Sequence, residues 1–203
     1  MDDGDTFAFV PFLDMCQHES LPSADFAADT RGFTLTALRD IAENDPVTIC
    51  YGSDYDSRRL FKQYGFVPLE GNAEDATLLR EAVCAASAAG VTGVNDARAE
   101  PSLALLGSLG SAFDAVKRTN PLATPSRLGA IYDVLTDGEA PSLGTLHAAV
   151  RWRLHKCAPT NLNQDIIDAE QLSPRIRAAV EYRIGWKRQL AVCDEVLSQI
   201  RRC

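Results

Sequence analysis

Two side chains in the first third of the chain carry groups suited to proton or amine chemistry, and both follow apolar segments. His18 ends the run Asp14-Met15-Cys16-Gln17-His18, and Tyr51 stands before Gly52 at the end of a β-branched and aromatic run. A neutral imidazole can exchange a proton near pH 7, and a phenol both donates and accepts hydrogen bonds. Taken singly, a histidine after a strand is more often structural, and a strand-terminal tyrosine is usually a core residue with its hydroxyl satisfied nearby.

The remaining reactive residues do not form a known catalytic spacing. Six cysteines at positions 16, 50, 84, 157, 193 and 203 include no Cys-x-x-Cys pair, and His147 and His155 are two helical turns apart, too far to share a metal ion. The sequence contains no Gly-x-Gly-x-x-Gly, P-loop or Gly-x-Ser-x-Gly motif. These patterns predict reduced thiols, no metal site, and surface or packing roles for the two later histidines.

The elements expected to position His18 and Tyr51 are short strands. The segments 7–15, 32–38 and 47–51 are apolar, alternating or β-branched and predict strands, whereas the polar segment 19–31 predicts a surface loop. Residues 56–64 change to helical spacing, and Gly65 is a natural stop for that helix.

From residue 72 onward the apolar period is helical almost throughout. We expect helices over 74–89, 101–118, 125–136, 142–157, 161–171 and 174–201. Ser142 and the Ser173-Pro174 pair are helix-start signals, and Gly90 and Gly138 are stop signals. The basic residues of the last helix, among them Lys187 and Arg188, predict a solvated face. The change of period predicts an α+β chain with a β-rich domain over 1–68 and an all-α domain over 69–203.

The charge distribution bears on partners. The net charge is −8. Residues 1–68 carry 12 acidic and 5 basic side chains, a net of −7, whereas 69–203 carry 16 and 15, a net of −1. An acidic surface argues against nucleic acid and anionic membranes as partners and favours a cationic one. No apolar run approaches the ~20 residues of a membrane helix, and the acidic start is unlike a targeting peptide, so the compartment and oligomeric state stay open.

The ordered motifs resemble the SET-domain protein methyltransferases of the Rubisco large-subunit lysine methyltransferase type. In that family a strand enters Val-Pro-x-x-Asp-Met-x-Asn-His, followed by Arg-Asp-Ile-x-x-Gly-Glu-x-Val, a strand ending in Tyr-Gly, and a helix before Tyr-Gly-Phe-Val. The matching segments here are 10–18, 39–47, Tyr51-Gly52 and Tyr64-Gly65-Phe66-Val67. The segments 172–175 and 179–190 resemble the closing helix of the substrate-binding domain in the same family, so the resemblance covers nearly the whole chain.

The resemblance implies a protein-lysine N-methyltransferase that uses S-adenosylmethionine and acts on a lysine-bearing protein. It implies that Tyr51 is the catalytic tyrosine. It further implies that the cofactor is bound by Gln17, His18 and Phe66, and that the lysine channel is bordered by Asp14 and Tyr64. Methyl transfer requires a neutral amine held in line with the methyl group in a dry site, and a fixed phenol can accept a hydrogen bond from that amine.

Departures from the family pattern leave alternatives open. Gln17 replaces an asparagine, Asn44-Asp45 replaces Gly-Glu, and Asp56-Ser57 replaces Ser-Asn. The glycine-rich segment that wraps the cofactor is expected before Asp14 and is not found there, so we expect a fragment of a longer SET protein, holding its C-terminal SET segment. The alternatives are a non-catalytic protein-binding module, an inactive fragment, and a methyltransferase whose target is a protein histidine.

Overall fold

The computed structural model describes residues 8–94, 103–157 and 160–202. It divides into two compact units, Met1–Asp54 and Tyr55–Cys203, which we call the β unit and the helical unit. The β unit holds all four of the strands described and the helical unit all seven α-helices described, so the expected α+β class is confirmed. The boundary between the two units falls between Asp54 and Tyr55 in the sequence. The domain boundary expected at 68/69 stays a prediction.

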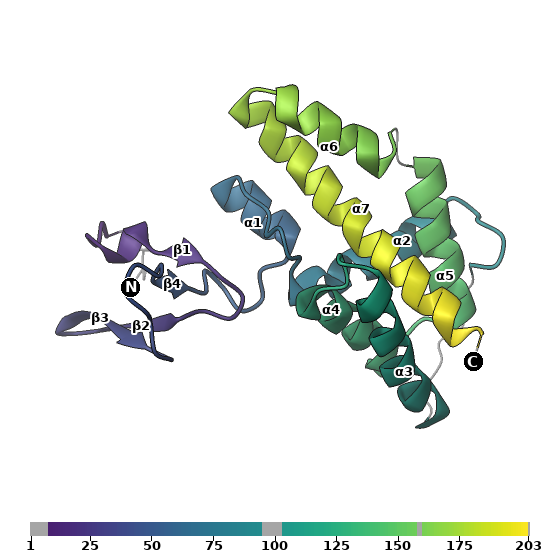
Figure 1. Ribbon diagram of the computed structural model, residues 1–203, viewed down its shortest axis with the longest axis horizontal. Coiled ribbons are helices and arrows are strands. Elements are labelled where there is room, and N and C mark those ends of the chain that lie inside the picture. Colours follow the sequence, from purple (N-terminus) through teal and green to yellow (C-terminus); the bar gives the residue numbers. More distant parts are fainter. Residues whose placement is uncertain (1–7, 95–102, 158–159, 203) are drawn as a thin grey trace, which may run out of the picture. The chain divides into compact units, whose positions relative to one another are not determined.

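The β unit contains two small sheets (Figure 1). Strand β1 (Gln17–His18) pairs in parallel with β4 (Thr48–Ile49), and β2 (Ala24–Asp29) pairs antiparallel with β3 (Gly32–Ala37). The strands expected at 32–38 and 47–51 are therefore confirmed.

Two expectations for the β unit are wrong. Residue 7 of the strand expected at 7–15 lies outside the described residues. The described part, 8–15, contains a turn and a short 3-10 helix, Leu13–Met15, because Pro11 cannot extend a ladder and Phe12 has a positive φ of 69°. The segment 19–31 contains β2, which pairing with β3 imposes on residues of low strand propensity such as Ala and Asp. The tight turn between these strands is closed by Asp29, whose carboxylate accepts from the backbone N–H of Arg31 at 2.7 Å.

The helical unit is built from seven α-helices within the described ranges. These are α1 (Ser57–Tyr64), α2 (Ala76–Ala88), α3 (Leu103–Thr119), α4 (Pro125–Thr136), α5 (Leu143–Trp152), α6 (Leu162–Gln171) and α7 (Pro174–Ile200), with a 3-10 turn at Ala73–Asp75 and a π-helical turn at Arg153–Cys157. All the expected helices are confirmed within a few residues at each end, except that the one at 142–157 is α-helical only to Trp152. Ser142 caps α5 by accepting from Thr145, Pro174 begins α7, and Gly65 ends α1 with a φ of 79°.

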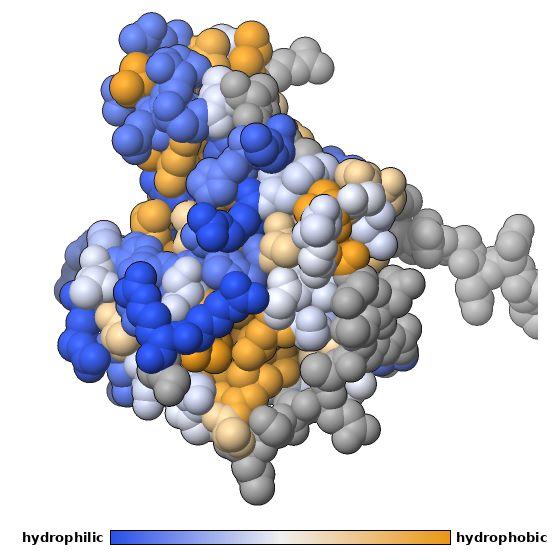
Figure 2. Space-filling model, turned by 90° about the vertical axis from the view of Figure 1, so that its right-hand side faces the viewer, coloured by the Kyte–Doolittle hydropathy of each residue, from blue (hydrophilic) through white to orange (hydrophobic). Residues whose placement is uncertain are grey.

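The long helix α7 organises this unit. Figure 1 shows α6 along its first half and α5 and α3 near its second half, in agreement with the contacts of these helices. A core of nineteen buried apolar residues from α2, α3, α4, α5, α7 and the α3–α4 connection lies between them, with Leu79, Ile131, Leu146 and Leu190 fully buried. Burial of this size is the main source of stability in a helical domain. On the face seen in Figure 2, hydrophilic side chains cover much of the surface and apolar ones gather in a patch between them.

The expected solvated basic face of the last helix is wrong for Lys187, which is 1% exposed. Its Nζ lies 2.5 Å from the carboxylate of Asp165, which is fully buried and also accepts from Arg183 at 2.8 Å and from Thr160. Burial acts to raise the pKa of Asp165, but the hydrogen bonds from Arg183 and Lys187 outweigh it and lower that pKa to about 2. This cluster joins α6 to α7, and its inward position cannot be read from a run of basic residues.

Candidate active site

The parallel pairing of β1 with β4 brings His18 and Tyr51 together. His18 is the last residue of β1 and pairs with Ile49, and Tyr51 follows two residues beyond that partner. The backbone N–H of Tyr51 donates to Nδ1 of His18 at 3.2 Å, and the two ring centroids are 5.3 Å apart. Two residues that are 33 positions apart in sequence thus form one site at the carboxyl ends of adjacent strands.

The environment of His18 favours its neutral form. Burial lowers the pKa of His18, and the nearby carboxylate of Glu19 opposes this in part. Because Nδ1 accepts the hydrogen bond from Tyr51, the proton of the neutral imidazole belongs on Nε2. The imidazole ring of His18 therefore packs beside Tyr51 in a fixed orientation and carries no charge in this form.

The hydroxyl of Tyr51 has a defined orientation. It donates its proton to the carbonyl oxygen of Cys16 at 2.7 Å. With the proton directed to that carbonyl, the lone pairs of the phenol oxygen are directed elsewhere and can accept from an N–H donor. Cys16, Ala24 and Ile49 form a small buried apolar cluster with Tyr51 and Leu13 packed against it, so the tyrosine ring rests on a dry floor.

A second set of contacts holds β4 in place, and no sequence motif indicates these contacts. Ser23 and Thr48 exchange hydrogen bonds: the N–H of Ser23 donates to Oγ1 of Thr48 at 3.0 Å, and the N–H of Thr48 donates to Oγ of Ser23 at 2.9 Å. Thr48 also donates to Glu19 at 2.7 Å, and Arg39 donates to the same carboxylate at 3.2 Å. Serine and threonine are common in loops, so only the tertiary pairing reveals that these residues support the site.

Asp14 and Gln17 lie next to the site in the chain and make local contacts. The carboxylate of Asp14 is exposed and accepts from the backbone N–H of Val10 at 2.6 Å, across the turn at Phe12. The exposed side chain of Gln17 donates to the carbonyl of Met15 at 3.4 Å. These contacts fix the shape of the turn, and the roles of Asp14 in substrate binding and of Gln17 in cofactor binding stay predictions.

Tyr64 and Phe66 belong to the helical unit. Tyr64 is the last residue of α1 and half exposed, and its ring lies 6.3 Å from the ring of Phe66 in a tilted arrangement. The left-handed backbone of Gly65 between them turns the chain and brings the two rings together. They thus form an aromatic pair with each other. The roles of Tyr64 in the lysine channel and of Phe66 in cofactor binding stay predictions.

A second histidine, His147, lies in a buried polar cluster that has a structural role rather than a catalytic arrangement. His147 is buried, and its Nε2 lies 2.9 Å from Asp194 and 3.5 Å from Ser198. Because the acid and the hydroxyl approach the same ring nitrogen, they cannot act as a Ser-His-Asp relay, which uses both nitrogens. Within the described ranges, no group of three or more His, Cys, Asp or Glu side chains could hold a metal ion. No described helix is both long enough and apolar enough to cross a membrane.

The fold and site define an α+β protein whose β unit presents a neutral histidine and an oriented tyrosine hydroxyl at paired strand ends. Part of the chain is similar to SET domain-containing protein 8 of Schizosaccharomyces pombe, with 38% identity over 59 residues. The similar part is 29% of this chain and spans 14% of that relative's length. No family model matches the chain. This similarity supports a SET-related segment in the chain. It does not support the assignment to the Rubisco methyltransferase type.

Proposed function

We propose that the chain belongs to a protein-lysine N-methyltransferase that uses S-adenosylmethionine, with Tyr51 at the reacting centre. The observation that carries the proposal is the hydroxyl of Tyr51, whose proton is held by the carbonyl of Cys16 beside the neutral ring of His18. The partial similarity to a SET domain-containing protein agrees with this reading.

Tyr51 would act as an acceptor for the target amine. A lysine amine has a solution pKa of about 10.4, so at pH 7 it must lose a proton before its lone pair can attack. An uncharged phenol oxygen over an apolar floor favours the neutral amine, because a dry site disfavours the ammonium ion. The hydrogen bond to Tyr51 would also fix the direction of the nitrogen lone pair, which an in-line displacement requires.

The residues assigned to the cofactor have suitable chemistry. Gln17 uses its amide N–H group within the turn, which leaves the amide oxygen as an exposed acceptor. The partly buried ring of Phe66 offers a face on which adenine can stack. S-adenosylmethionine, held by Gln17, His18 and Phe66, would supply an activated methyl group on a sulfonium ion.

The charge of the β unit suits a cationic protein substrate. Residues 8–54 contain eight acidic and two basic side chains, and every one of the acidic residues is exposed. A surface of this sign attracts lysine-rich segments and steers them by long-range electrostatics. We therefore expect methyl transfer to slow as salt concentration rises.

The proposal is tested by transfer of a radiolabelled methyl group from S-adenosylmethionine to peptide pools. One pool contains lysine, a second has arginine in place of lysine, and a third has histidine as its only basic residue. Label in the lysine pool alone supports the proposal, whereas label in the histidine pool alone reassigns the target to histidine. No label in any pool, from a folded sample, contradicts the proposal for this chain.

A non-catalytic binding module is the second candidate. It is favoured by the helical unit, which has its own large core and a surface pocket with both apolar and charged walls. Binding of a protein partner without any methyl transfer would support this candidate over the first.

A further inference from the structure

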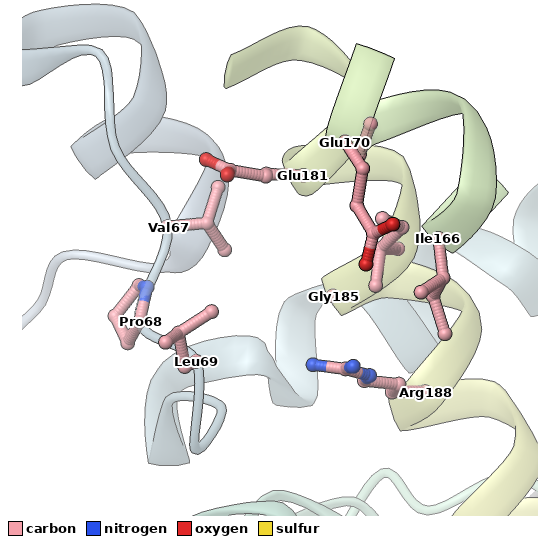
Figure 3. Close-up of a pocket in the computed structure, with 10 residues that line it drawn as sticks. Val67, Pro68, Leu69, Ile166, Glu170, Glu181, Gly185 and Arg188 are labelled. Atoms are coloured by element: carbon pink, nitrogen blue, oxygen red, sulfur yellow. The ribbon is translucent and has the colours of Figure 1, made fainter. Parts of the chain in front are cut away.

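A pocket in the helical unit lies between α6, α7 and the segment that follows α1. It has a volume of about 200 Å³. Figure 3 shows the apolar side chains of Val67 and Leu69 on one side and Ile166 on the other. Sites for drug-sized ligands span roughly 300–1,000 Å³, so this pocket matches one or two side chains rather than a whole cofactor.

The backbone around the pocket is fixed. A Cβ atom at Gly185 would lie 3.1 Å from Val67, so the glycine lets this segment approach α7 closely. The carbonyl of Leu69 accepts from the buried guanidinium of Arg127 at 2.6 Å, which ties the same segment to α4. The floor is closed by Ala169 and Ile184, which are buried between α6 and α7. The pocket is therefore built from anchored elements.

The charges at the pocket are separated. Figure 3 shows the guanidinium of Arg188 directed into the cavity from one end and the carboxylate of Glu170 facing it from another. Arg188 forms no ion pair within the described ranges, and its buried Nε has no hydrogen-bond partner there. Burial, and secondarily the charge of Arg188, lower the pKa of Arg127 to about 10, so these two cations lie close enough to repel each other. Glu181 adds a second carboxylate to the lining.

We propose that this pocket binds a short segment of a protein partner in which an apolar side chain lies between a cationic and an anionic one. The apolar side chain would fill the space between Leu69 and Ile166. An anionic group would pair with Arg188, whose charge lacks a partner within the described ranges, and a cationic group would pair with Glu170 and Glu181. This inference does not depend on methyl transfer, because it concerns binding to the helical unit alone.

The test is a charge reversal read by peptide binding. A library of short fluorescent peptides varies the order and spacing of one Lys, one Leu and one Asp, and binding is measured by anisotropy. We expect the wild type to prefer one order by about tenfold over its charge-swapped counterpart, a size typical of one or two paired charges. The double variant Glu170→Lys with Arg188→Glu should prefer the opposite order. Replacing Leu with Ser should abolish binding in both proteins.

The control is Asp133→Lys with Arg118→Glu, which makes the same charge changes at exposed positions outside the pocket. It should keep the wild-type preference. Equal binding of both charge orders by the wild type would overturn the proposal, as would an unchanged preference in the folded pocket variant. Because no step uses S-adenosylmethionine, failure here leaves the test of methyl transfer unaffected.

Discussion

The β unit and the helical unit are stabilised in different ways. Among its described residues, the helical unit buries a cluster of nineteen apolar residues and a charged cluster around Asp165. In the described part of the β unit, the buried apolar cluster has three residues, and Phe26, Phe33 and Leu35 remain 42–50% exposed on one face of the β2–β3 ribbon. The candidate site at His18 and Tyr51 therefore lies in the unit with the smaller core. Side-chain hydrogen bonds contribute a larger share of the stability there than they do in the helical unit.

The largest effect should come from breaking the buried charge cluster of the helical unit. Asp165→Asn leaves Lys187 and Arg183 without their shared carboxylate, and loss of one partner of a buried ion pair costs about 3–5 kcal/mol. Urea unfolding followed by helical circular dichroism measures this change. The matched control is Asp29→Asn in the β unit, whose partner Arg31 is 89% exposed, and it should leave stability almost unchanged because solvent screens an exposed ion pair. Equal effects would contradict the distinction between the units.

Truncation of an apolar side chain should also lower stability more in the helical unit than in the β unit. Leu79→Ala removes a fully buried side chain from the main cluster, and we expect a loss of about 3 kcal/mol in the free energy of unfolding. Phe33→Ala removes a half-exposed ring from the β2–β3 ribbon, and we expect about 1 kcal/mol or less. Both are measured by denaturant unfolding. A larger loss for Phe33→Ala would mean that the ribbon face is covered.

A pH dependence should follow from Asp75 in the helical unit. Asp75 accepts from the N–H and hydroxyl of Ser57, and burial raises its pKa from 3.8 to about 6. A raised carboxyl pKa favours the protonated folded form, so its contribution is fully present below about pH 4 and is lost as pH rises through about 6. The shift of about two pH units corresponds to about 3 kcal/mol.

Asp75→Asn is the matched comparison for this effect, because the amide keeps the size of the group and removes its titration. We expect the difference in unfolding free energy between wild type and variant to change by up to about 3 kcal/mol between pH 4 and pH 7. A difference that stays constant across this range would show that burial does not perturb Asp75.

After the effects at Asp165, Leu79 and Asp75, a smaller loss of stability should come from breaking the hydrogen bonds that support the site. Thr48→Val keeps the shape of a buried side chain but leaves the N–H of Ser23 without its acceptor. We expect a loss of about 2 kcal/mol, confined to the β unit. Hydrogen exchange should show faster exchange for residues 17–24 and 47–51 with unchanged exchange in α7. Uniform acceleration in both units would contradict their separate stabilisation.

The sequence predicts the helical unit well because each helix has its own apolar period and several have cap residues, such as Ser142 and Gly65. It predicts the β unit less well. The turn at Phe12 is set by Pro11 and by a local hydrogen bond to Asp14, and β2 forms by pairing with the neighbouring strand β3. The apolar period of either segment does not indicate these structures.

The candidate site shows the same limit. His18 and Tyr51 are recognisable from their motifs, but their contact depends on the parallel register of β1 with β4. The inward position of Lys187 and the support from Ser23 and Thr48 are likewise set by tertiary structure. The local sequence around these three residues carries no sign of burial.

The most direct measurement is the rate of methyl transfer to the lysine pool by Tyr51→Phe, compared with wild type at saturating S-adenosylmethionine. The control Tyr132→Phe removes a hydroxyl from a residue that is 46% exposed on α4. We expect Tyr51→Phe to slow transfer by about 100-fold or more, with the affinity for S-adenosylmethionine by calorimetry unchanged, and Tyr132→Phe to match wild type. A Tyr51→Phe variant that transfers methyl groups at the wild-type rate would contradict the role assigned to Tyr51.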